Sequence, residues 1–471
     1  MKTRALSLVL MMIVAVFIPV AAQADTITVN SLDDDGNGLD GDCNFREALM
    51  AAEGNIGLDA CDPGGGADEI VFASGLTGTI SLASALPSVK ESLTVTGPGA
   101  DVLTIDGGQH DSIFFLNSTT NDQTFTFTGL TLTNGFGSDG GGALYVSVGD
   151  TLVVSRCVVT GNSNGGKGRA GGIAVESATL VMTDSTVSDN ESVNTGGGID
   201  IFNAGGKAVL RNSTVSGNRV SDVGDGVNVG AGAGGGIRCS GCVLDVVNST
   251  ISGNEAVIEG GGISNDGTVR LRNTTVSDNT AGAGAGGVFN EGGANVFLKN
   301  SLIAGNEDTS GGAPDCSGVL SSQDFNLIGD TEGCAFVGTT THNVTDENAL
   351  LGLLAGNGGP TFTHALLADS PALDAGNPAG CVDENDAPLT TDQRGFERPV
   401  GGACDIGALE SGGCGDGVVD AARGEECDDG NDDDSDACRN DCTSPPAGTT
   451  GGTTGGATAG GDAGGGCSLI R

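Results

Sequence analysis

The sequence contains no tryptophan and one tyrosine, and aromatic residues make up 3% of its 471 residues. Basic residues are also few, because 19 Lys and Arg stand against 61 Asp and Glu and the net charge is −42. So strong a negative charge excludes nucleic acids and anionic lipids as partners, since both are polyanions. The lack of aromatic residues argues against an ordinary globular core, and 85 glycines favour short strands joined by many turns.

One long apolar run occurs, and it lies at the N-terminus. A basic stretch at 1–4 precedes it, and it closes on Ala22-Gln23-Ala24. This pattern predicts a signal peptide at residues 1–24, with cleavage after Ala24. A membrane anchor is the alternative, because the run is near the lower length limit for a span. No later segment is apolar enough to cross a bilayer, so the mature chain is expected to be extracellular or at the outer cell surface.

All 14 cysteines follow the predicted cleavage site, in a compartment that permits disulfides. Many are close together, and local pairing is the expectation, although the sequence does not fix the connectivity. The disulfide candidates are Cys43 and Cys61, Cys239 and Cys242, Cys316 and Cys334, Cys381 and Cys404, and the group Cys414, Cys427, Cys438 and Cys442. Local pairing leaves Cys157 and Cys467 single.

A repeat of about 28 residues occupies the centre of the chain. Six segments end in an aligned asparagine, at intervals of 28, 28, 36, 25 and 27 residues. A variable loop follows, and then a Gly-Gly-Ile or Gly-Gly-Val element. The six asparagines are Asn162, Asn190, Asn218, Asn254, Asn279 and Asn306.

Apolar residues keep a constant register within each repeat. Leu180 and Met182 lie ten and eight residues before Asn190, which is strand periodicity, and Val187 lies three before it. The odd step between them predicts a bend six residues before the terminal asparagine. Four repeats have a further asparagine there, which tolerates left-handed backbone angles and could stack into an amide ladder. These ladder candidates are Asn212, Asn248, Asn273 and Asn300.

A unit of this size with three short strands cannot bury its own apolar residues. Stacked units place each strand about 4.8 Å from its copy and bury a continuous core. The sequence therefore predicts an all-β right-handed parallel β-helix, a solenoid, with an N-terminal cap and a small disulfide-rich C-terminal module. Leucine-rich repeats and propeller blades need patterns that are not present.

The repeats resemble those of right-handed β-helix surface proteins of the polymorphic outer membrane protein type. Residues 25–60 resemble a CSLREA domain, through Thr-Ile-Thr-Val at 26–29 and Cys-Asn-Phe-Arg-Glu-Ala at 43–48. The family motif has Cys-Ser-Leu-Arg-Glu-Ala, so this sequence departs from it at two positions. The resemblance implies an N-terminal cap of one strand and a short helix near 45–52 that closes the first coil.

Residues 326–410, after a β-helix predicted for 61–325, resemble a choice-of-anchor Q domain. The matching segments are Asn-Gly-Gly-Pro-Thr at 357–361, Ser-Pro-Ala-Leu-Asp-Ala-Gly at 370–376 and Thr-Asp-Gln-Arg-Gly at 391–395. The resemblance implies a surface protein whose anchoring device varies within the family, and it places this segment at the end of the β-helix.

The C-terminal segments differ in composition. Residues 411–444 are similar to a Cys-rich repeat of myxobacterial surface proteins, and a flexible Gly/Thr-rich tail is expected at 445–471. Gly-Gly-Gly-Cys at 464–467 resembles a bacterial C-terminal sorting signal, which makes Cys467 a candidate sorting cysteine. Such signals continue with an apolar helix and basic residues, so either this part is missing or Cys467 is a plain terminal thiol.

Two cysteine patterns have a chemical and a structural interpretation. Cys157 stands where the other repeats have Ser or Thr, which favours a small stacked side chain over a reactive thiol. The spacing of Cys239 and Cys242 matches a redox motif, but no thioredoxin-like pattern surrounds it, so a local disulfide is expected.

Parallel β-helices often cleave polysaccharides, but the motifs of that chemistry are not present. A pectin hydrolase needs acidic pairs with Gly-His-Gly and Arg-Ile-Lys elements, and a pectate lyase needs clustered aspartates with a basic residue. The three histidines are His110, His342 and His364, and the last lies in the anchor-Q resemblance, where a structural role is expected. We expect no catalytic residues. A polysaccharide-active enzyme, either a pectate-lyase-like lyase or a glycoside hydrolase, remains the alternative.

Two acidic loops are calcium candidates, because their oxygen-bearing side chains alternate around a glycine. The first resembles half of a calcium loop, but Asn44 stands where a bidentate glutamate is needed. Solvated acidic loops are the alternative interpretation. The candidate ligands are Asp33, Asp35, Asn37 and Asp40 in the first loop and Asp428, Asn431, Asp432 and Asp434 in the second. No other cofactor is expected.

These observations together predict an exported, non-catalytic adhesin or scaffold. The variable loops that follow each terminal asparagine would stack along one edge of the rod and would carry its binding specificity. A monomer is expected, whose partner is a surface glycan or protein that the sequence does not name.

Overall fold

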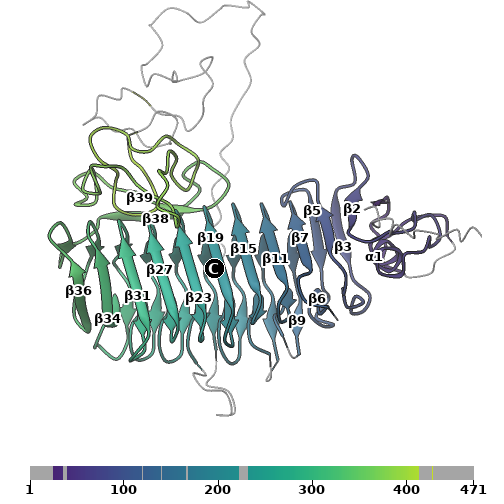
Figure 1. Cartoon of the computed structure of the whole chain (residues 1–471), viewed down its shortest axis with the longest axis horizontal. Helices are drawn as coiled ribbons and strands as arrows, with labels where there is room; N and C mark the ends of the chain where they lie inside the picture. The colour runs from purple at the N-terminus through teal and green to yellow at the C-terminus, as the bar shows by residue number, and fades with distance from the viewer. Residues whose placement is uncertain are drawn as a thin grey trace, which may run out of the picture.

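The computed structural model describes residues 25–35, 40–118, 120–138, 140–165, 168–221 and 232–412, together with Cys427. The predicted signal peptide, most of the Cys-rich segment and the Gly/Thr-rich tail lie outside the described residues. Within them the chain forms a parallel β-solenoid with a further region packed on its side (Figure 1), which confirms the predicted fold class. No helix of the described part is long and apolar enough to cross a membrane.

Each coil of the solenoid contributes strands to several stacked parallel sheets, which we number I to IV. Sheets I and II share the long strand β34 and together contain 19 strands. Sheet I consists of β1 (Thr26–Val29), β2 (Asp68–Phe72), β4 (Leu93–Thr96), β7 (Thr124–Thr128), β11 (Thr151–Ser155), β15 (Thr179–Thr183), β19 (Lys207–Arg211), β23 (Val243–Val247), β27 (Thr268–Arg272), β31 (Asn295–Lys299), β34 (Cys316–Gln323) and β36 (Cys334–Thr339). Sheet II consists of β6 (Phe114–Leu116), β10 (Leu144–Val146), β14 (Ile173–Glu176), β18 (Ile199–Phe202), β22 (Ile237–Cys239), β26 (Ile263–Asn265), β30 (Val288–Asn290) and the start of β34.

Sheets III and IV complete each coil. Sheet III contains 11 strands and sheet IV contains seven very short ones. Sheet III consists of β3 (Gly78–Ser81), β5 (Leu103–Asp106), β8 (Thr131–Thr133), β12 (Val158–Thr160), β16 (Thr186–Ser188), β20 (Thr214–Ser216), β24 (Thr250–Ser252), β28 (Thr275–Ser277), β32 (Leu302–Ile303), β35 (Leu327–Ile328) and β37 (Val344–Thr345). Sheet IV consists of β9 (Phe136–Gly137), β13 (Ser163–Asn164), β17 (Glu191–Ser192), β21 (Arg219–Val220), β25 (Glu255–Ala256), β29 (Thr280–Ala281) and β33 (Glu307–Asp308).

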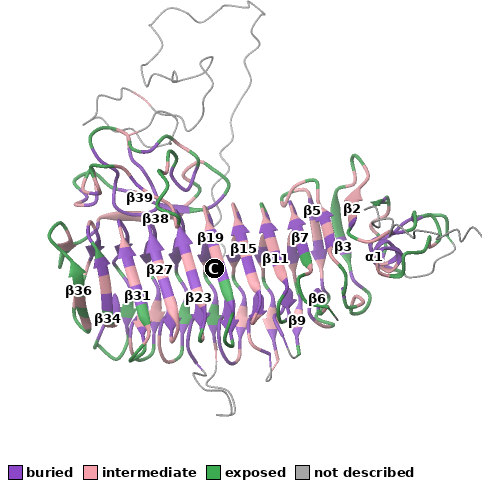
Figure 2. Ribbon diagram, in the orientation of Figure 1, coloured by how far each residue is buried: buried purple, intermediate pink, exposed green. Residues whose placement is uncertain are grey.

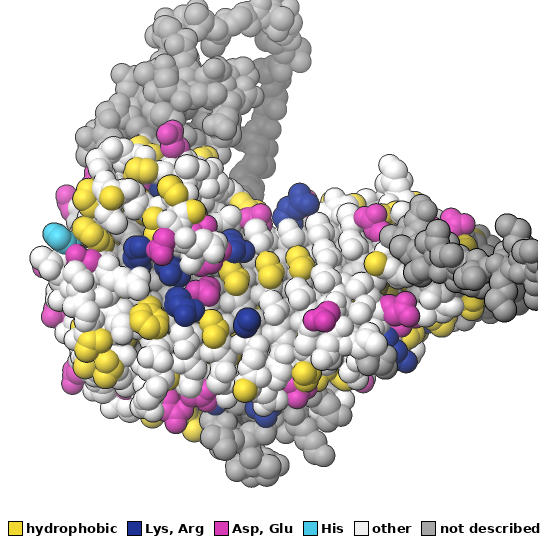
Figure 3. All heavy atoms as spheres, in the orientation of Figure 1, with side chains coloured by type: hydrophobic (Ala, Val, Ile, Leu, Met, Phe, Trp, Pro, Cys, Tyr) yellow, Lys and Arg dark blue, Asp and Glu magenta, His cyan; other side chains and the backbone are white. Residues whose placement is uncertain are grey.

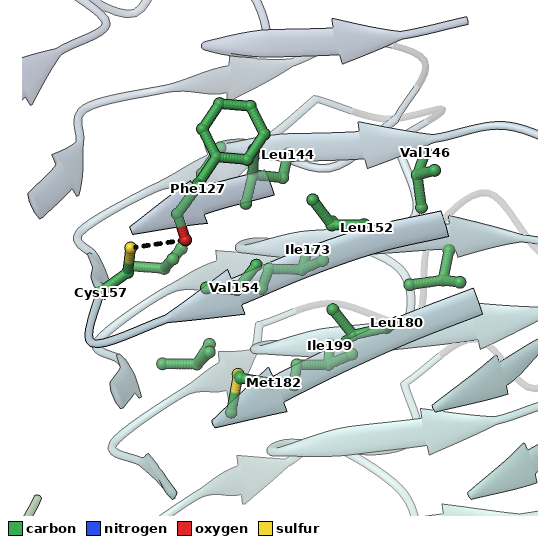
Figure 4. Close-up of a cluster of buried hydrophobic side chains, with 14 of the residues drawn as sticks. Phe127, Leu144, Val146, Leu152, Val154, Cys157, Ile173, Leu180, Met182 and Ile199 are labelled. Atoms are coloured by element: carbon green, nitrogen blue, oxygen red, sulfur yellow. Dashed lines mark hydrogen bonds between the residues drawn. The ribbon is translucent and has the colours of Figure 1, made fainter. Parts of the chain in front are cut away.

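The core lies inside the coil and follows the predicted register. Leu152 pairs with Leu180, and Val154 with Met182, so that equal positions of successive repeats stack. Figure 4 shows these side chains in rows, with Ile173 and its neighbours of sheet II facing them across the interior. Figure 2 shows the resulting alternation of buried and more exposed residues along the strands. The repeat therefore encodes a continuous apolar interior, as the strand periodicity predicts.

The bend between sheets I and III also lies where the repeat predicts it. All six residues at this position have φ values between 48° and 51°, in the left-handed region. Besides the four asparagines these are Arg156 and Asp184. Asparagine is favoured there because it tolerates this conformation at lower cost than most side chains.

The Gly-Gly elements are required because the backbones of adjacent coils approach closely at the turn into sheet II. A Cβ atom on Gly171 would lie 2.3 Å from the carbonyl oxygen of Gly197, and one on Gly197 would lie 2.2 Å from that of Gly235. No side chain fits between such carbonyls and the next turn. The Gly-Gly repeat is therefore a packing requirement of the stacked coils.

The N-terminal end of the solenoid is closed by helix α1 (Phe45–Gly54). Asn44 and Glu47 form a reciprocal capping box at its start, and Asn55 ends it with φ of 51°. The ring of Phe45 contacts the rings of Phe72 and Phe114, at centroid distances of 5.8 and 5.9 Å, and covers the first coils. The structure therefore contains the predicted cap of one strand, β1, and one helix, α1.

Residues 346–412, which we call the side domain, leave the stack and fold back along it. They include the antiparallel hairpin of β38 (Leu351–Ala355) and β39 (Thr363–Leu366), followed by irregular loops. The segment at 326–345 continues the solenoid through β35, β36 and β37. The segment 326–410 therefore divides into two structural parts, and only the first forms the end of the β-helix.

Candidate binding groove

The calcium candidates fall partly within the described residues. Asp33 and Asp35 are exposed, and Asp35 Oδ1 accepts a hydrogen bond from the side-chain amide of Asn44 at 3.3 Å. Asp40 Oδ1 accepts from the Asp42 amide at 3.0 Å. No group of three or more His, Cys, Asp or Glu side chains in the described part of the chain is arranged to hold a metal. Asn37, Asp428, Asn431, Asp432 and Asp434 lie outside the described residues, and calcium binding stays a prediction.

The acidic residue with a structural role in the first loop is Asp34, which was not among the candidates. Its carboxylate is buried and forms a salt bridge with Arg46 of α1 at 2.6 Å. It also accepts a hydrogen bond from the Ala83 amide at 2.7 Å. Asp34 therefore links the loop to the cap helix through its ion pair and to the second coil through its hydrogen bond.

Local pairing of the cysteines is confirmed for four pairs. Disulfides join Cys43 to Cys61, Cys239 to Cys242, Cys316 to Cys334 and Cys381 to Cys404. Cys427 is also disulfide-bonded, whereas Cys414, Cys438, Cys442 and Cys467 lie outside the described residues. The disulfide between Cys239 and Cys242 confirms the local pairing that we expect at this spacing.

Cys157 is a free, fully buried cysteine. Its backbone amide donates to Ser185 Oγ of the next coil at 3.1 Å, and its thiol faces the Phe127 carbonyl (Figure 4). Burial raises the pKa of the Cys157 thiol to about 11. A thiol that stays protonated and is shielded from solvent is a poor nucleophile, which agrees with a stacked structural side chain.

The predicted amide ladder at the bend forms only in two separate pairs. Asn248 donates to Asn212 Oδ1 at 3.4 Å, and Asn300 donates to Asn273 Oδ1 at 3.1 Å. Between these pairs the ladder is interrupted, because Asn273 donates to the Val382 carbonyl of the side domain at 2.8 Å. The amide ladder at the bend is therefore partial, because side-domain carbonyls compete for the amides.

A continuous amide column runs instead through the terminal asparagines of the repeat, which sequence reasoning used only as alignment marks. Each side-chain amide donates to the Oδ1 of the next coil at 2.8 or 2.9 Å, and also to a backbone carbonyl. The column ends on Asp315, whose Oδ1 accepts from Asn306 at 2.8 Å. Burial raises the pKa of Asp315 to about 6. The members of this asparagine column are Asn162, Asn190, Asn218, Asn254, Asn279 and Asn306.

Outward-facing hydroxyl groups form a second column along sheet III. The middle residue of each strand points into the core, so its two neighbours face outward, and these are mostly Thr and Ser. We call this set the hydroxyl column. Its members are Thr131, Thr133, Thr160, Thr186, Ser188, Thr214, Ser216, Thr250, Ser252, Thr275 and Ser277.

The side domain covers the hydroxyl column from β20 onward and hydrogen-bonds to it. Thr214 donates to the Phe362 carbonyl at 2.6 Å, and Thr250 donates to Gln393 Oε1 at 2.7 Å. Thr275 Oγ1 accepts from the Ala408 amide at 3.1 Å. The covered half of the column therefore holds the side domain in place through its hydroxyl groups.

Ser252 and His364 meet at the border of the covered half. His364 Nδ1 donates to the Gly352 carbonyl at 2.7 Å, which leaves Nε2 to accept from Ser252 Oγ at 2.8 Å. A hydroxyl beside an imidazole is also the arrangement of an activated nucleophile. Both side chains are buried, with relative exposures of 1% and 2%, and the neighbouring hydroxyls make equivalent contacts. We therefore interpret the pair as a docking contact, as expected for His364.

A buried ionic network underlies the side domain. Arg398 pairs with Glu410 at 2.9 Å and donates to Asn248 Oδ1 of the solenoid at 2.8 Å. Arg394 pairs with Asp392 at 2.8 Å, and all four charged side chains are shielded from solvent. Burial, together with the like charge of Glu410, raises the pKa of Asp405 to about 6. These contacts make the side domain a fixed part of the fold.

A second set of charges holds the side domain on sheet I. Figure 3 shows basic side chains gathered on this face below the side domain, with acidic ones between them. Arg211 pairs with Glu384, and Lys299 pairs with Asp386 at 3.1 Å. These basic side chains of sheet I therefore have partners in the acidic turn of the side domain that contains Glu384 and Asp386.

Part of the hydroxyl column lines an open groove, through Thr186, Ser188 and Ser216. Two hollows, of about 490 and 670 Å³, share the residues Val158, Thr186 and Pro360 and so form one continuous groove. The second hollow extends along Ser188 and Ser216 to the edge of the side domain. Thr186 thus lies where the two hollows meet.

The lip of the groove is apolar and belongs to the side domain. Phe362 and Leu353 line the second hollow, and their relative exposures are 55% and 85%. Four acidic residues line the two hollows, and one basic residue, Arg156, lies in the first. The acidic residues are Asp101, Asp184, Asp189 and Asp278. The groove therefore combines hydroxyl groups, exposed apolar side chains and a negative charge.

Two of the groove carboxylates, those of Asp189 and Asp278, are widely spaced. Asp189 and Asp278 follow β16 and β28, which are separated by three coils, or about 14 Å at ~4.8 Å per coil. Glycoside hydrolysis needs two carboxyl groups roughly 5 to 9.5 Å apart. These two residues therefore do not form a hydrolytic pair.

No family model matches the chain, and no curated protein matches it. The resemblances to the CSLREA and choice-of-anchor Q domains thus have no support from a family model. Among solved structures the chain is similar to the "Crystal structure of pectate lyase Pel9A", with a TM-score of 0.43 and 15% identity, over 83% of this chain and 98% of that one.

Proposed function

We propose that the protein is an exported, non-catalytic binding protein that holds a neutral polysaccharide chain in the open groove of sheet III. The observation that carries the proposal is the hydroxyl column, which passes from beneath the side domain into the groove without a change of chemistry. In the covered half its hydroxyl groups bond to carbonyl, carboxamide and imidazole groups. In the groove Thr186, Ser188 and Ser216 offer the same hydroxyl groups to a ligand rich in hydrogen-bonding groups.

The apolar lip favours a carbohydrate over other polar ligands. A sugar ring has a polar rim and an apolar face, so it can bond to Thr186 while its face packs on Phe362. Pockets that combine apolar side chains with a few placed polar groups are typical of ligand sites. Repeating units along a polysaccharide also suit a surface that repeats every coil.

The charge of the groove selects among polysaccharides. Four carboxylates and one guanidinium line it, and the whole chain carries −42. Polyuronates and sulfated chains would be repelled, because like charges in one site cost free energy that salt only partly screens. A neutral chain is therefore the ligand that we propose.

Glycan-array binding by the mature protein tests this proposal, followed by calorimetry on the neutral polysaccharides that bind. Phe362→Ala should weaken binding about tenfold, since an aromatic side chain that becomes covered by the ligand contributes on the order of 1.5 kcal/mol. Ile56→Ala is the matched control, because Ile56 is similarly exposed (58%) but lies beside the N-terminal cap. Equal losses in both variants, or retention of acidic chains alone, would contradict the proposal.

Cleavage of the bound chain is the rival function, as a lyase or a hydrolase. A reducing-sugar assay and an assay for unsaturated products on the same polysaccharides distinguish the two. We expect no product above the level of buffer. If product forms, Ser252→Ala asks whether the pair of Ser252 and His364 has a catalytic role rather than a docking role.

A further inference from the structure

Asp68 places a buried carboxylate at the start of β2, beside the first described residue of the chain. Its relative exposure is 2%, and its Oδ1 accepts hydrogen bonds from the amides of Gly65 at 2.8 Å and Asp25 at 3.2 Å. Its Oδ2 has no hydrogen-bond partner among the described residues. A buried carboxylate oxygen without a partner is costly, so it calls for an explanation.

The backbone encloses this oxygen on one side. A Cβ atom on Gly64 would lie 2.4 Å from Oδ2, and the backbone of Ala52 lies just beyond it. The turn at Gly64 and the end of α1 therefore wall the carboxylate on one side. The backbone nitrogen of Asp25 approaches the same carboxylate from the sheet.

The position of Asp25 is set by strand pairing. Its carbonyl accepts from the Glu69 amide at 2.9 Å, and Thr26 pairs with Glu69 in the parallel register of β1 and β2. The nitrogen of Asp25 is therefore held 3.2 Å from Asp68 Oδ1, within salt-bridge distance of a charged group. In the full chain that nitrogen is a neutral amide with one hydrogen to donate.

We propose that removal of residues 1–24 creates an ion pair between the new α-ammonium of Asp25, an exposed residue, and the buried carboxylate of Asp68, which stabilises the N-terminal cap. The inference builds on the predicted cleavage after Ala24 and is independent of the groove. A leader-removing peptidase hydrolyses the bond between Ala24 and Asp25. Water supplies the hydroxyl of the Ala24 carboxyl group, and the released amine takes up a proton to become an ammonium.

The ammonium differs from the amide in its charge and in the number of hydrogens that it can donate. It carries a full positive charge and three hydrogens, so it can donate to both oxygens of Asp68 in place of one. A charge-assisted pair at this partly buried site is stronger than a neutral hydrogen bond and can satisfy the second carboxylate oxygen of Asp68. Processing would thus stabilise the end of the solenoid that α1 closes.

A thermodynamic cycle on the full mature protein tests the proposal. The chain that begins at Asp25 is compared with one that begins at Ala24, which moves the charge by one residue, each with Asp68 and with Asp68→Asn. We expect the extension to lower Tm by about 2 °C or more in the Asp68 background and to have no effect in the Asp68→Asn background. Asp62→Asn, at an exposed aspartate, is the matched control for the change in charge.

A second measurement needs no variant that could fail to fold. The α-amine of the mature chain should react with an amine-acylating reagent at pH 8 about tenfold more slowly than in the urea-unfolded protein, because the carboxylate of Asp68 favours its protonated form. Equal reactivity in both states, or an equal Tm loss in both backgrounds of the cycle, would overturn the proposal.

Discussion

The two halves of sheet III have the same outward chemistry but different surroundings. From β20 to β28 most of the hydroxyl column is buried beneath the side domain, and Thr214, Thr250 and Thr275 hydrogen-bond to it. From β8 to β16 the hydroxyl groups are partly exposed, and Thr186 and Ser188 of β16 line a groove. One repeated Thr/Ser pattern therefore serves as a docking surface in one half and is available to a ligand in the other.

The repeat therefore does not determine whether its outer surface contacts another part of the chain or faces solvent. The outcome depends on whether a later segment of the chain folds back over it. The side domain carries its own charges for this purpose, and it also supplies the apolar lip of the groove.

Removing Arg398 should have the largest effect, because it leaves Glu410 buried without its partner. We expect Arg398→Ala to lower the free energy of unfolding of the side domain by about 3 to 5 kcal/mol, measured by chemical denaturation and limited proteolysis. The matched control is Arg219→Ala, whose ion pair with Glu191 is about half exposed on both sides and contributes about 1 kcal/mol or less. Equal effects would mean that the ionic network does not hold the covered half.

The pH dependence of stability should show the buried carboxyl group of Asp405. Because its pKa is raised from 3.8 to about 6, the native state binds more protons than the unfolded chain between these values. Its contribution is full below pH 3.8 and is lost as the pH rises through about 6. We expect denaturant unfolding to give a flatter profile between pH 4 and 6 for Asp405→Asn, by on the order of 2 kcal/mol.

The control for that profile is Asp62→Asn, which should keep the slope of the natural protein. Asp405→Asn also loses one acceptor for the amides of Asp374 and Ser411, so its stability is expected to be lower at every pH. The change of slope, rather than the offset, tests the account. An unchanged slope would contradict the assignment of this titration to Asp405.

A pair of Thr→Val changes compares the two halves directly. Thr250→Val removes a buried hydrogen bond to Gln393 and should cost about 1 to 2 kcal/mol of stability, with polysaccharide affinity unchanged. Thr186→Val should leave stability within about 0.5 kcal/mol and weaken polysaccharide binding roughly threefold to tenfold. Thermal unfolding and calorimetry measure the two effects. The opposite assignment would refute the division into halves.

The smallest effect is expected at the outer contact of the side domain. Lys299→Ala removes a half-exposed ion pair with Asp386 and should cost less than about 1 kcal/mol. The loss should shrink further in 1 M salt, because exposed charges are screened. A salt-independent loss would show that the alkyl chain of Lys299, rather than its charge, contributes the stability.

The repeat alone was sufficient to predict the sheets, the inward-facing residues and the left-handed bend. These features are set by contacts between equal positions of neighbouring coils, so periodicity reveals them. The fourth strand of each coil was missed because two residues are too few to show a period, as in β13 and β17. The asparagine column was overlooked as a hydrogen-bonded element, although its six members were the most regular feature of the sequence.

The side domain could not be derived from periodicity, because most of its hydrogen bonds to the solenoid join residues that are between 77 and 180 positions apart. The ladder at the bend shows the consequence, since Asn248 and Asn273 donate to Thr391 and Val382 of the side domain. The groove was missed for the same reason, because its floor and its lip come from distant segments. Sequence reasoning placed the binding surface on the variable loops instead.

Hydrogen–deuterium exchange with and without a bound neutral polysaccharide tests the central claim most directly. The account predicts added protection in β12, β16 and the segment from Leu353 to Phe362, and unchanged exchange in the loops after Asn190 and Asn254. Protection confined to those loops would place the binding site on the loop edge and contradict the groove.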